Sequence, residues 1–213
     1  MSRVRIKFCG ITRAEDAQTA AELGVDAIGL VFVATSRRFV DSRRAREILK
    51  QLPPLLTTVG LFMDAQADQV REVLEAVHLD LLQFHGVETP EYCEQFGRPY
   101  IKALAMGGDV DALVEADRYA RARGLLLDAH RAGEMGGSGV SFDWDAIPAQ
   151  LSPRILLAGG LDEHNVGAAV TRVRPYAVDV SSGIESSPGI KCARRMQKFI
   201  DEVNRASREP GQP

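Results

Sequence analysis

The sequence predicts a parallel α/β fold closed into a (β/α)8 barrel, and two observations favour it. Eight short apolar strands alternate with eight helical stretches, at a spacing of about 25 residues along the 213-residue chain. One strand, residues 27–33, is apolar almost throughout, as is typical of a strand buried on both faces of a parallel sheet. An open doubly wound sheet is the rival. It normally has fewer strands and a Gly-x-Gly-x-x-Gly turn after the first, whereas Gly10 stands alone there.

The first unit is a strand at residues 4–8 and a helix at residues 13–23. The strand alternates apolar and charged side chains with the period of two that a half-buried strand needs. Thr12 and Glu15 have the spacing of a capping box, in which each side chain accepts from a backbone amide at the helix start. Gly24 is expected to end this helix.

The second unit contains the apolar strand and a more polar helix. A polar loop leads from residues 27–33 to Asp41, the expected N-cap of a helix. Pro53 and Pro54 cannot continue a helix, so we expect this one to end near residue 52.

The remaining six units repeat the alternation. Thr89, with Pro90 in the first turn, and Asp162 are expected to cap two of the helices. We expect the strands at residues 57–63, 79–84, 100–104, 125–128, 155–158 and 177–180, and the helices at residues 66–77, 90–96, 110–123, 143–150, 163–173 and 190–204.

Composition places the chain among ordinary globular proteins. Hydrophobic residues make up 45%, charged residues 26%, and the formal charge of −3 lacks the basic excess of a nucleic-acid-binding protein. No apolar run reaches the roughly 18 residues of a membrane helix, and no signal-peptide core follows Met1. Three cysteines without a close pair favour reduced thiols. We therefore expect a cytoplasmic protein without a nucleic-acid or membrane partner.

Domain organisation is expected to be simple. One barrel domain spans residues 1–206, and residues 207–213 form a frayed tail because they lack an apolar anchor. For the assembly we expect a monomer or a homodimer.

Residues that are distant in the sequence meet at the mouth of a barrel, because all eight strands end there. Cys9 closes the first strand, where a thiol is placed for chemistry or packs as a small buried hydrophobe. Asp128 follows an apolar run. This suits a carboxyl group that donates a proton, although a solvated carboxylate or a structural ion pair would fit the same pattern. The other candidates at strand ends are Gln83, His85, Lys102 and Asp179.

Glycine-rich turns follow the last two strands, where barrels of this fold frequently bind phosphate. Gly159 and Gly160 form the first turn, and Ser182 and Gly183 lie in the second. Glycine allows close approach of the backbone, so that successive amides can point at one anion. A further glycine run, residues 136–139, follows the sixth strand. Tight turns need glycine in any case, but two at these strand ends favour a phosphate ligand.

Arg38 lies in the loop after the second strand. An arginine fork binds a carboxylate with two hydrogen bonds, so the mouth suits a ligand with a phosphate at one end and a carboxylate at the other. The alternative is that Arg37, Arg38 and the arginines that follow form a solvated basic face.

Several motifs, taken together, carry a resemblance to a known family. They lie at residues 7–12, 83–86, 127–128, 136–139, 142–144, 158–161 and 178–185. Over residues 3 to about 203 the chain resembles the phosphoribosylanthranilate isomerase family of tryptophan biosynthesis. The resemblance implies a single-domain TIM barrel of the ribulose-phosphate-binding type that needs no cofactor or metal. It implies an Amadori rearrangement of N-(5-phospho-β-D-ribosyl)anthranilate to 1-(2-carboxyphenylamino)-1-deoxy-D-ribulose 5-phosphate.

The resemblance also implies roles for the candidate residues. Asp128 matches the general acid, which protonates the furanose ring oxygen and opens the ring to a Schiff base. Cys9 matches the general base, which takes the proton from ribose C2. Arg38 resembles the ligand of the anthranilate carboxylate, and Asp179 a further substrate contact. The phosphate would be held by Gly159, Gly160, Ser182 and Gly183.

Other readings stay open at this point. One alternative is an epimerase of ribulose phosphate, an enzyme that usually needs two carboxylates and a metal. Another is indole-glycerol-phosphate synthase, which needs a catalytic lysine, and Lys102 is the candidate for that role. A phosphate-binding barrel without activity and a thiol-based redox sensor are further alternatives.

A thiol acts as a base only as thiolate, so Cys9 needs a depressed pKa or coupled proton transfer. Lys7 is not expected to help, on the ground that alternate strand residues face opposite ways.

Overall fold

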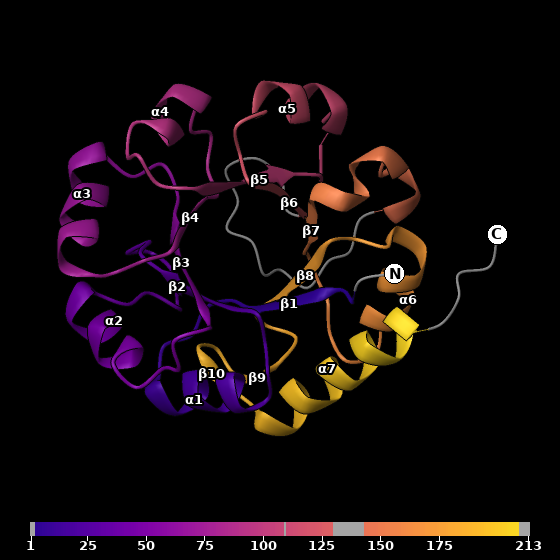
Figure 1. Cartoon of the computed structure of the whole chain (residues 1–213), viewed down its shortest axis with the longest axis horizontal. Helices are drawn as coiled ribbons and strands as arrows, with labels where there is room; N and C mark the ends of the chain where they lie inside the picture. The colour runs from indigo at the N-terminus through magenta and orange to yellow at the C-terminus, as the bar shows by residue number, and fades with distance from the viewer. Residues whose placement is uncertain (1–2, 109, 130–142, 209–213) are drawn as a thin grey trace.

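The computed structural model describes residues 3–108, 110–129 and 143–208. Its eight parallel strands pair in chain order and the last pairs with the first, so the predicted (β/α)8 barrel is confirmed. Figure 1 looks down the barrel, with the strands inside a ring of helices. The strands are β1 (Arg5–Phe8), β2 (Ala27–Val31), β3 (Thr57–Phe62), β4 (Leu81–Phe84), β5 (Tyr100–Ala105), β6 (Gly124–Asp128), β7 (Ile155–Leu157) and β8 (Ala177–Val180).

The helices pack on the outer face of the barrel. Two of the expected caps are confirmed: Asp41 accepts from the amide of Arg44, and Thr89 accepts from the amide of Tyr92, with Pro90 in the first turn. The α-helices are α1 (Ala14–Glu22), α2 (Ser42–Leu49), α3 (Ala67–Ala76), α4 (Pro90–Glu94), α5 (Ala112–Arg118), α6 (Val166–Val173) and α7 (Ala193–Arg208).

The capping box predicted for the first helix is wrong. Arg13 is the N-cap of α1 and makes no side-chain capping hydrogen bond. The hydroxyl of Thr12 instead donates to the carbonyl oxygen of Gly189. A tertiary contact therefore replaces the local cap.

Two helices between β6 and β8 also differ from the prediction. Residues 143–150 do not form one α-helix, since two 3-10 helices lie here, η1 (Trp144–Ala146) and η2 (Ala149–Arg154). Prolines at positions 148 and 153 withhold amide donors from an α-helical ladder, which explains the change. Helix α6 starts after Asn165, because Asp162 accepts from the amides of His164 and Asn165 and holds a turn before the helix.

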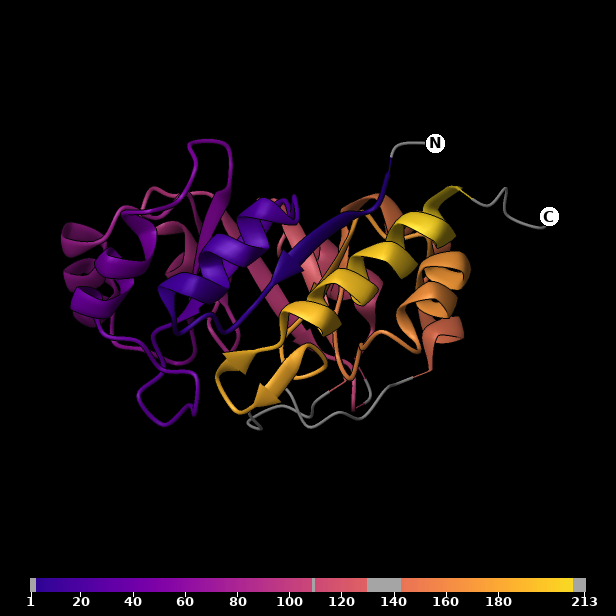
Figure 2. The same ribbon diagram turned by 90° about the horizontal axis from the view of Figure 1, so that it is seen from below.

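The connection from β8 to the last helix contains a hairpin that the sequence pattern does not predict. Strands β9 (Glu185–Ser187) and β10 (Ile190–Lys191) pair antiparallel where the expected helix at residues 190–204 would begin. Figure 2 shows this hairpin at one end of the barrel, with α7 beginning beside it and running to the opposite end. Helix α7 reaches Arg208, so the first two residues of the expected tail are helical, and residues 209–213 lie outside the described ranges.

Side chains alternate along each strand between the helices and the barrel interior. Outward-facing Phe8 packs edge-on against Phe199 of α7, and Phe62 and Phe84 pack together under the neighbouring helices. The interior is closed by a cluster consisting of Ile101, Ala103, Leu126, Leu156, Ala158 and Ala177. A filled interior leaves the mouth as the place for a ligand. In the described ranges, no helix has the length and hydropathy needed to cross a bilayer.

Candidate active site

A cavity of about 450 Å³ lies at the mouth of the barrel. Five of the predicted site residues line it: Cys9, Arg38, Asp128, Asp179 and Ser182. They come from the ends of β1, β6 and β8 and from the loop after β2, so closure of the barrel brings them together. The lining also includes Gln83, His85 and Glu185.

Cys9 is buried directly after β1, on the same face of the chain as Lys7. Residues two apart on a strand share a face, and both side chains reach Gly29 of β2. A Cβ added to Gly29 would lie 2.8 Å from Cys9 Sγ and 3.3 Å from Lys7 Nζ, so this position leaves room for both groups. Lys7 Nζ donates to Asp179 Oδ1 at 2.7 Å. The expectation that Lys7 faces away from Cys9 is therefore wrong.

The surroundings of Cys9 oppose and support its ionisation at once. Burial raises the pKa of the Cys9 thiol above its ordinary value, while the nearby ammonium groups of Lys7 and Lys191 act to lower it. Burial also opposes the charge on Lys7, but Asp179 and Cys9 outweigh it and hold the pKa of Lys7 above its usual value. Lys7 therefore stays protonated and stabilises a thiolate at Cys9 when one forms.

Asp128 closes β6, on a different side of the mouth from Cys9. It is 7% exposed, and its Oδ2 lies 3.4 Å from Nε2 of His85. The other ring nitrogen of His85, Nδ1, lies 3.0 Å from Nε2 of Gln83. His85 and Gln83 both come from the end of β4, so this strand orients the carboxyl group of Asp128.

Arg38 is part of an ion pair and does not belong to a solvated basic face. Its Nε and Nη2 donate to Oε1 and Oε2 of Glu185 at 2.7 and 2.8 Å. The stem of Arg38 passes over Gly10, which has a φ of 71°, and a Cβ there would lie 2.4 Å from Cδ of Arg38. Glycine at position 10 is thus required by both the backbone conformation and the packing of the arginine.

The turns after β7 and β8 pack against each other. Gly159 and Gly160 have φ values of 83° and 65°. A Cβ on Gly183 would lie 2.0 Å from the carbonyl oxygen of Leu161, so the two turns touch through their backbones. Of the four predicted phosphate ligands, Ser182 is among the described residues that line the cavity, whereas Gly159, Gly160 and Gly183 are not. The glycine run at residues 136–139 lies outside the described ranges.

Lys102 does not point into the mouth, which removes it as a candidate catalytic lysine. Its neighbours Ile101 and Ala103 belong to the barrel interior, so Lys102 faces the helices. Its Nζ donates to the carbonyl oxygen of Gly86 at 2.6 Å and lies 3.3 Å from Oε2 of Glu88. Across the described part of the chain, no group of three or more His, Cys, Asp and Glu side chains is placed to hold a metal ion.

The sequence prediction lacks three charged residues: Glu185, which lines the cavity, and Lys7 and Lys191, which contact the lining residues Asp179 and Glu185. For Lys7 the signal was present, since its spacing of two from Cys9 places both on one strand face. Glu185 and Lys191 enter through the β9–β10 hairpin, whose few polar residues carry no strand periodicity.

The fold and its mouth define the class of the protein as a (β/α)8 barrel with a cavity lined by charged and polar side chains at the ends of its strands. Comparison with known proteins identifies the family within this class. Residues 6–202 match the family described as N-(5'-phosphoribosyl)anthranilate (PRA) isomerase. The chain belongs to this family, so the predicted resemblance and the predicted isomerase activity in tryptophan biosynthesis are confirmed.

Individual relatives match over nearly their whole length. The chain is 55% identical over 206 residues to N-(5'-phosphoribosyl)anthranilate isomerase of Pseudomonas putida strain F1, covering 97% of this chain and 100% of that one. The crystal structure of the Thermus thermophilus isomerase superposes with a TM-score of 0.83 at 36% identity, over 94% and 98% of the two chains. A phosphoribosyl anthranilate isomerase in complex with reduced 1-(o-carboxyphenylamino)-1-deoxyribulose 5-phosphate has a TM-score of 0.75 at 34% identity, over 94% and 98%.

Proposed function

We propose that this isomerase converts N-(5-phospho-β-D-ribosyl)anthranilate to 1-(2-carboxyphenylamino)-1-deoxy-D-ribulose 5-phosphate through acid–base catalysis by its own side chains, without a cofactor. One observation carries the mechanism: Cys9 and Asp128, from strands β1 and β6, line the same cavity. Family membership supports the reaction, and the ligand of one solved relative is a reduced form of the expected product.

Asp128 is proposed to start the reaction as the general acid. Its carboxyl proton passes to the furanose ring oxygen, the bond from that oxygen to C1 breaks, and the anilino nitrogen forms a Schiff base with C1. Asp128 is buried, and His85 is within reach of the carboxylate that remains. A positioned acid of this kind contributes roughly a hundredfold to ten-thousandfold in rate.

Cys9 is proposed to act next as the general base. The thiolate takes the proton from C2, and the electron pair of that bond forms the C1–C2 double bond of an enolamine while neutralising the iminium nitrogen. The C2 hydroxyl then loses a proton as C1 gains one, which gives the ketone. Lys7, hydrogen-bonded to Asp179, supplies the positive charge that favours the thiolate.

The two ends of the substrate are proposed to be held by the loops. Arg38 binds the anthranilate carboxylate, and Asp179 contacts the sugar. Gly159, Gly160, Ser182 and Gly183 bind the phosphate through backbone amides, which the packing of the two turns orients. Such anchoring fixes the sugar ring between the acid and the base, which is a large part of the rate enhancement expected of the site.

Complementation of a tryptophan auxotroph that lacks this isomerase tests the proposed function. The unmodified chain is expected to restore growth without tryptophan, whereas the Cys9→Ala and Asp128→Asn variants are not. Cys192→Ala is the matched control, because Cys192 is a free thiol that does not line the cavity. Growth supported by both Cys9→Ala and Asp128→Asn at normal expression would contradict the mechanism.

Two further features stay predictions of this proposal. The chain is expected to work in the cytoplasm, where free thiols such as Cys9 stay reduced. It is expected to be a monomer or a homodimer, which sedimentation of the purified protein decides.

A further inference from the structure

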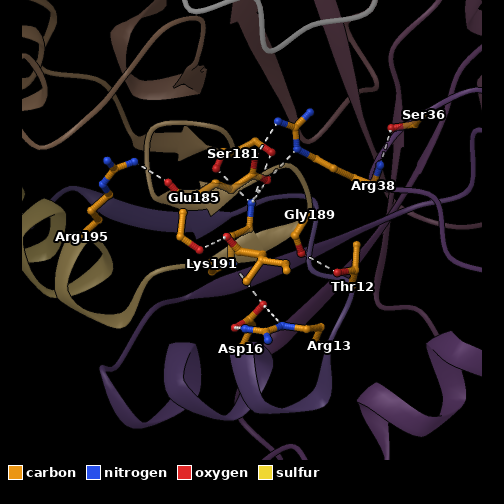
Figure 3. A network of polar contacts seen from close by, with 12 residues as sticks. Thr12, Arg13, Asp16, Ser36, Arg38, Ser181, Glu185, Gly189, Lys191 and Arg195 are labelled. Carbon is orange, nitrogen blue, oxygen red and sulfur yellow. Dashed lines mark hydrogen bonds and ion pairs between the residues drawn. The ribbon is translucent and has the colours of Figure 1, made fainter.

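The β9–β10 hairpin places Glu185 in the wall of the cavity and Lys191 behind it, in contact with Glu185. Their exposed fractions are 6% and 4%, so both charges are taken almost fully out of water. Burial of a charge is costly unless it is paired and hydrogen-bonded. Figure 3 shows the two residues at the centre of a network that reaches Arg38 on one side and Asp16 on the other.

The carboxylate of Glu185 is held by two cations. Arg38 donates to both of its oxygens, and Lys191 Nζ donates to Oε1 at 2.9 Å. Burial opposes the charge on Glu185, but the hydrogen bonds from Arg38 and the charge of Lys191 outweigh it and hold the pKa of Glu185 below its ordinary value. Glu185 is therefore an anion at neutral pH.

Lys191 is placed as an ammonium group. Besides Glu185, its Nζ has two acceptors on Ser181, the carbonyl oxygen at 3.0 Å and Oγ at 3.4 Å. Three acceptors match the three hydrogens of a protonated lysine. Burial lowers the pKa of Lys191 below its ordinary value, although the carboxylate of Glu185 acts to raise it. With Lys191 protonated, as its three acceptors indicate, the cluster of Arg38, Glu185 and Lys191 has a net charge of one positive unit, so Glu185 holds Arg38 without cancelling its positive charge.

The pairing also leaves one edge of the arginine for another anion. A guanidinium group has five hydrogens in a planar fork, and Glu185 uses the edge formed by Nε and Nη2. The second edge, formed by Nη1 and the remaining hydrogen of Nη2, has the spacing for a second bidentate carboxylate. Arg38 lines the cavity, so this geometry fits a substrate carboxylate.

The hairpin itself is tied to the body of the barrel. The amide of Lys191 donates to Oδ2 of Asp16 in α1 at 3.1 Å, and Arg13 donates to both oxygens of Asp16.

Two further hydrogen bonds hold the hairpin. Thr12 donates to the carbonyl oxygen of Gly189, and Arg195 of α7 donates to the carbonyl oxygen of Glu185 (Figure 3). Glu185 is thus a rigid anchor on which the longer and more flexible arginine is oriented.

We infer that Glu185 is a positioning residue of this enzyme: it orients Arg38 for the carboxylate of the substrate, while Lys191 preserves the positive charge that the carboxylate requires. The inference rests on the proposed function of Arg38 as the carboxylate ligand. It goes beyond that proposal, because it assigns the selectivity for a carboxylate-bearing substrate to a three-residue cluster and not to the arginine alone.

The test compares two probes that differ in the carboxyphenyl group. Reduced 1-(o-carboxyphenylamino)-1-deoxyribulose 5-phosphate carries the carboxylate, and ribulose 5-phosphate lacks it. Inhibition constants for both are measured on the intact protein and on Arg38→Ala, Glu185→Gln and Lys191→Met. Glu47→Gln is the matched control, since Glu47 pairs with Arg43 and Arg44 on the exposed face of α2.

Arg38→Ala and Glu185→Gln are expected to weaken binding of the carboxylate-bearing probe by roughly tenfold or more and to leave ribulose 5-phosphate within about twofold. The same variants should raise KM more than they lower kcat. Glu47→Gln should match the unmodified protein with both probes. A loss confined to the carboxylate-bearing probe separates positioning from a general loss of fold, which would weaken both.

The two levels of the proposal fail in different ways. If Arg38→Ala selectively weakens binding of the carboxylate-bearing probe but Glu185→Gln does not, the positioning role of Glu185 is overturned and the role of Arg38 stands. If Arg38→Ala weakens both probes equally or neither, the carboxylate assignment fails and the inference falls with it. Should Glu185→Gln not fold, Lys191→Met decides. A selective loss there supports the cluster, and unchanged binding overturns it.

Discussion

Cys9 is the residue whose chemistry depends most on its neighbours. Its thiol is buried, which favours the neutral form, and yet the proposed reaction needs the thiolate. Lys7 resolves this conflict in part, because a protonated amine on the same strand face compensates the negative charge. Asp179 sets the balance, since it shares Lys7 with Cys9.

The Lys7→Met and Asp179→Asn variants test this balance through the pH dependence of kcat/KM. Removal of the ammonium group disfavours the thiolate, so Lys7→Met should move the acidic limb of the profile to higher pH. Asp179 acts to raise the pKa of Cys9, so Asp179→Asn should move the same limb to lower pH. Shifts in the same direction would show that Lys7 and Asp179 do not tune the thiol. Thermal unfolding is the control, because breaking a buried ion pair costs about 3–5 kcal/mol.

The proposed role of Asp128 as the general acid is tested by a separate variant. Asp128→Asn keeps the shape of the side chain but removes the proton donor, so kcat should fall by roughly a hundredfold or more. Folding should change little, as checked by circular dichroism and thermal unfolding. Turnover near the normal rate in a folded Asp128→Asn protein would remove Asp128 from the mechanism.

At the scale of elements, the regular parts of the barrel are the predictable ones. Strands such as β2 and β6 are apolar runs between helices, and all eight strands lie at the expected places. The β9–β10 hairpin is short and polar, so it leaves no periodic signal, and it forms because tertiary contacts to α1 and α7 hold it. The capping box at Thr12 fails for the same reason, since the hydroxyl finds a partner in this hairpin.

The contact between the turns after β7 and β8 gives a prediction at this scale. Gly183→Ala places a methyl group 2.0 Å from the carbonyl oxygen of Leu161, so the two turns must move apart. We expect a loss of about 1–3 kcal/mol in the free energy of unfolding and weaker inhibition by inorganic phosphate. Gly108→Ala is the control, because nothing lies within 4 Å of an added Cβ there. Phosphate inhibition that is unchanged in Gly183→Ala would separate this contact from the phosphate site.

At the scale of the whole molecule, barrel closure explains why so much of the site is predictable. Once eight parallel strands are recognised, Cys9, Asp128 and Asp179 must meet at one mouth, and they do. The direction of a side chain is harder to predict, as Lys102 shows. A shift of one position along a strand decides whether a residue faces the cavity or the helices. Pairings across loops, such as Arg38 with Glu185, are set by three-dimensional packing and leave no trace in sequence spacing.

Independence from metal ions is a further prediction for the molecule as a whole. The proposed mechanism assigns every proton transfer to side chains of the chain itself. Prolonged treatment with a strong chelator, followed by removal of the chelator, should leave kcat and KM unchanged. Loss of activity that Mg²⁺, Mn²⁺ or Zn²⁺ restores would contradict the cofactor-free mechanism and revive the metal-dependent reading of this fold.

The central claim is that Asp128 and Cys9 act at two different steps on one bound sugar. The kinetic isotope effect on kcat with substrate deuterated at ribose C2 tests it most directly. In Cys9→Ser the removal of the C2 proton should limit the rate, which gives a large primary isotope effect. In Asp128→Asn ring opening should limit the rate, so the isotope effect should approach unity. Equal isotope effects in the two variants, or a reversal of this order, would contradict the account.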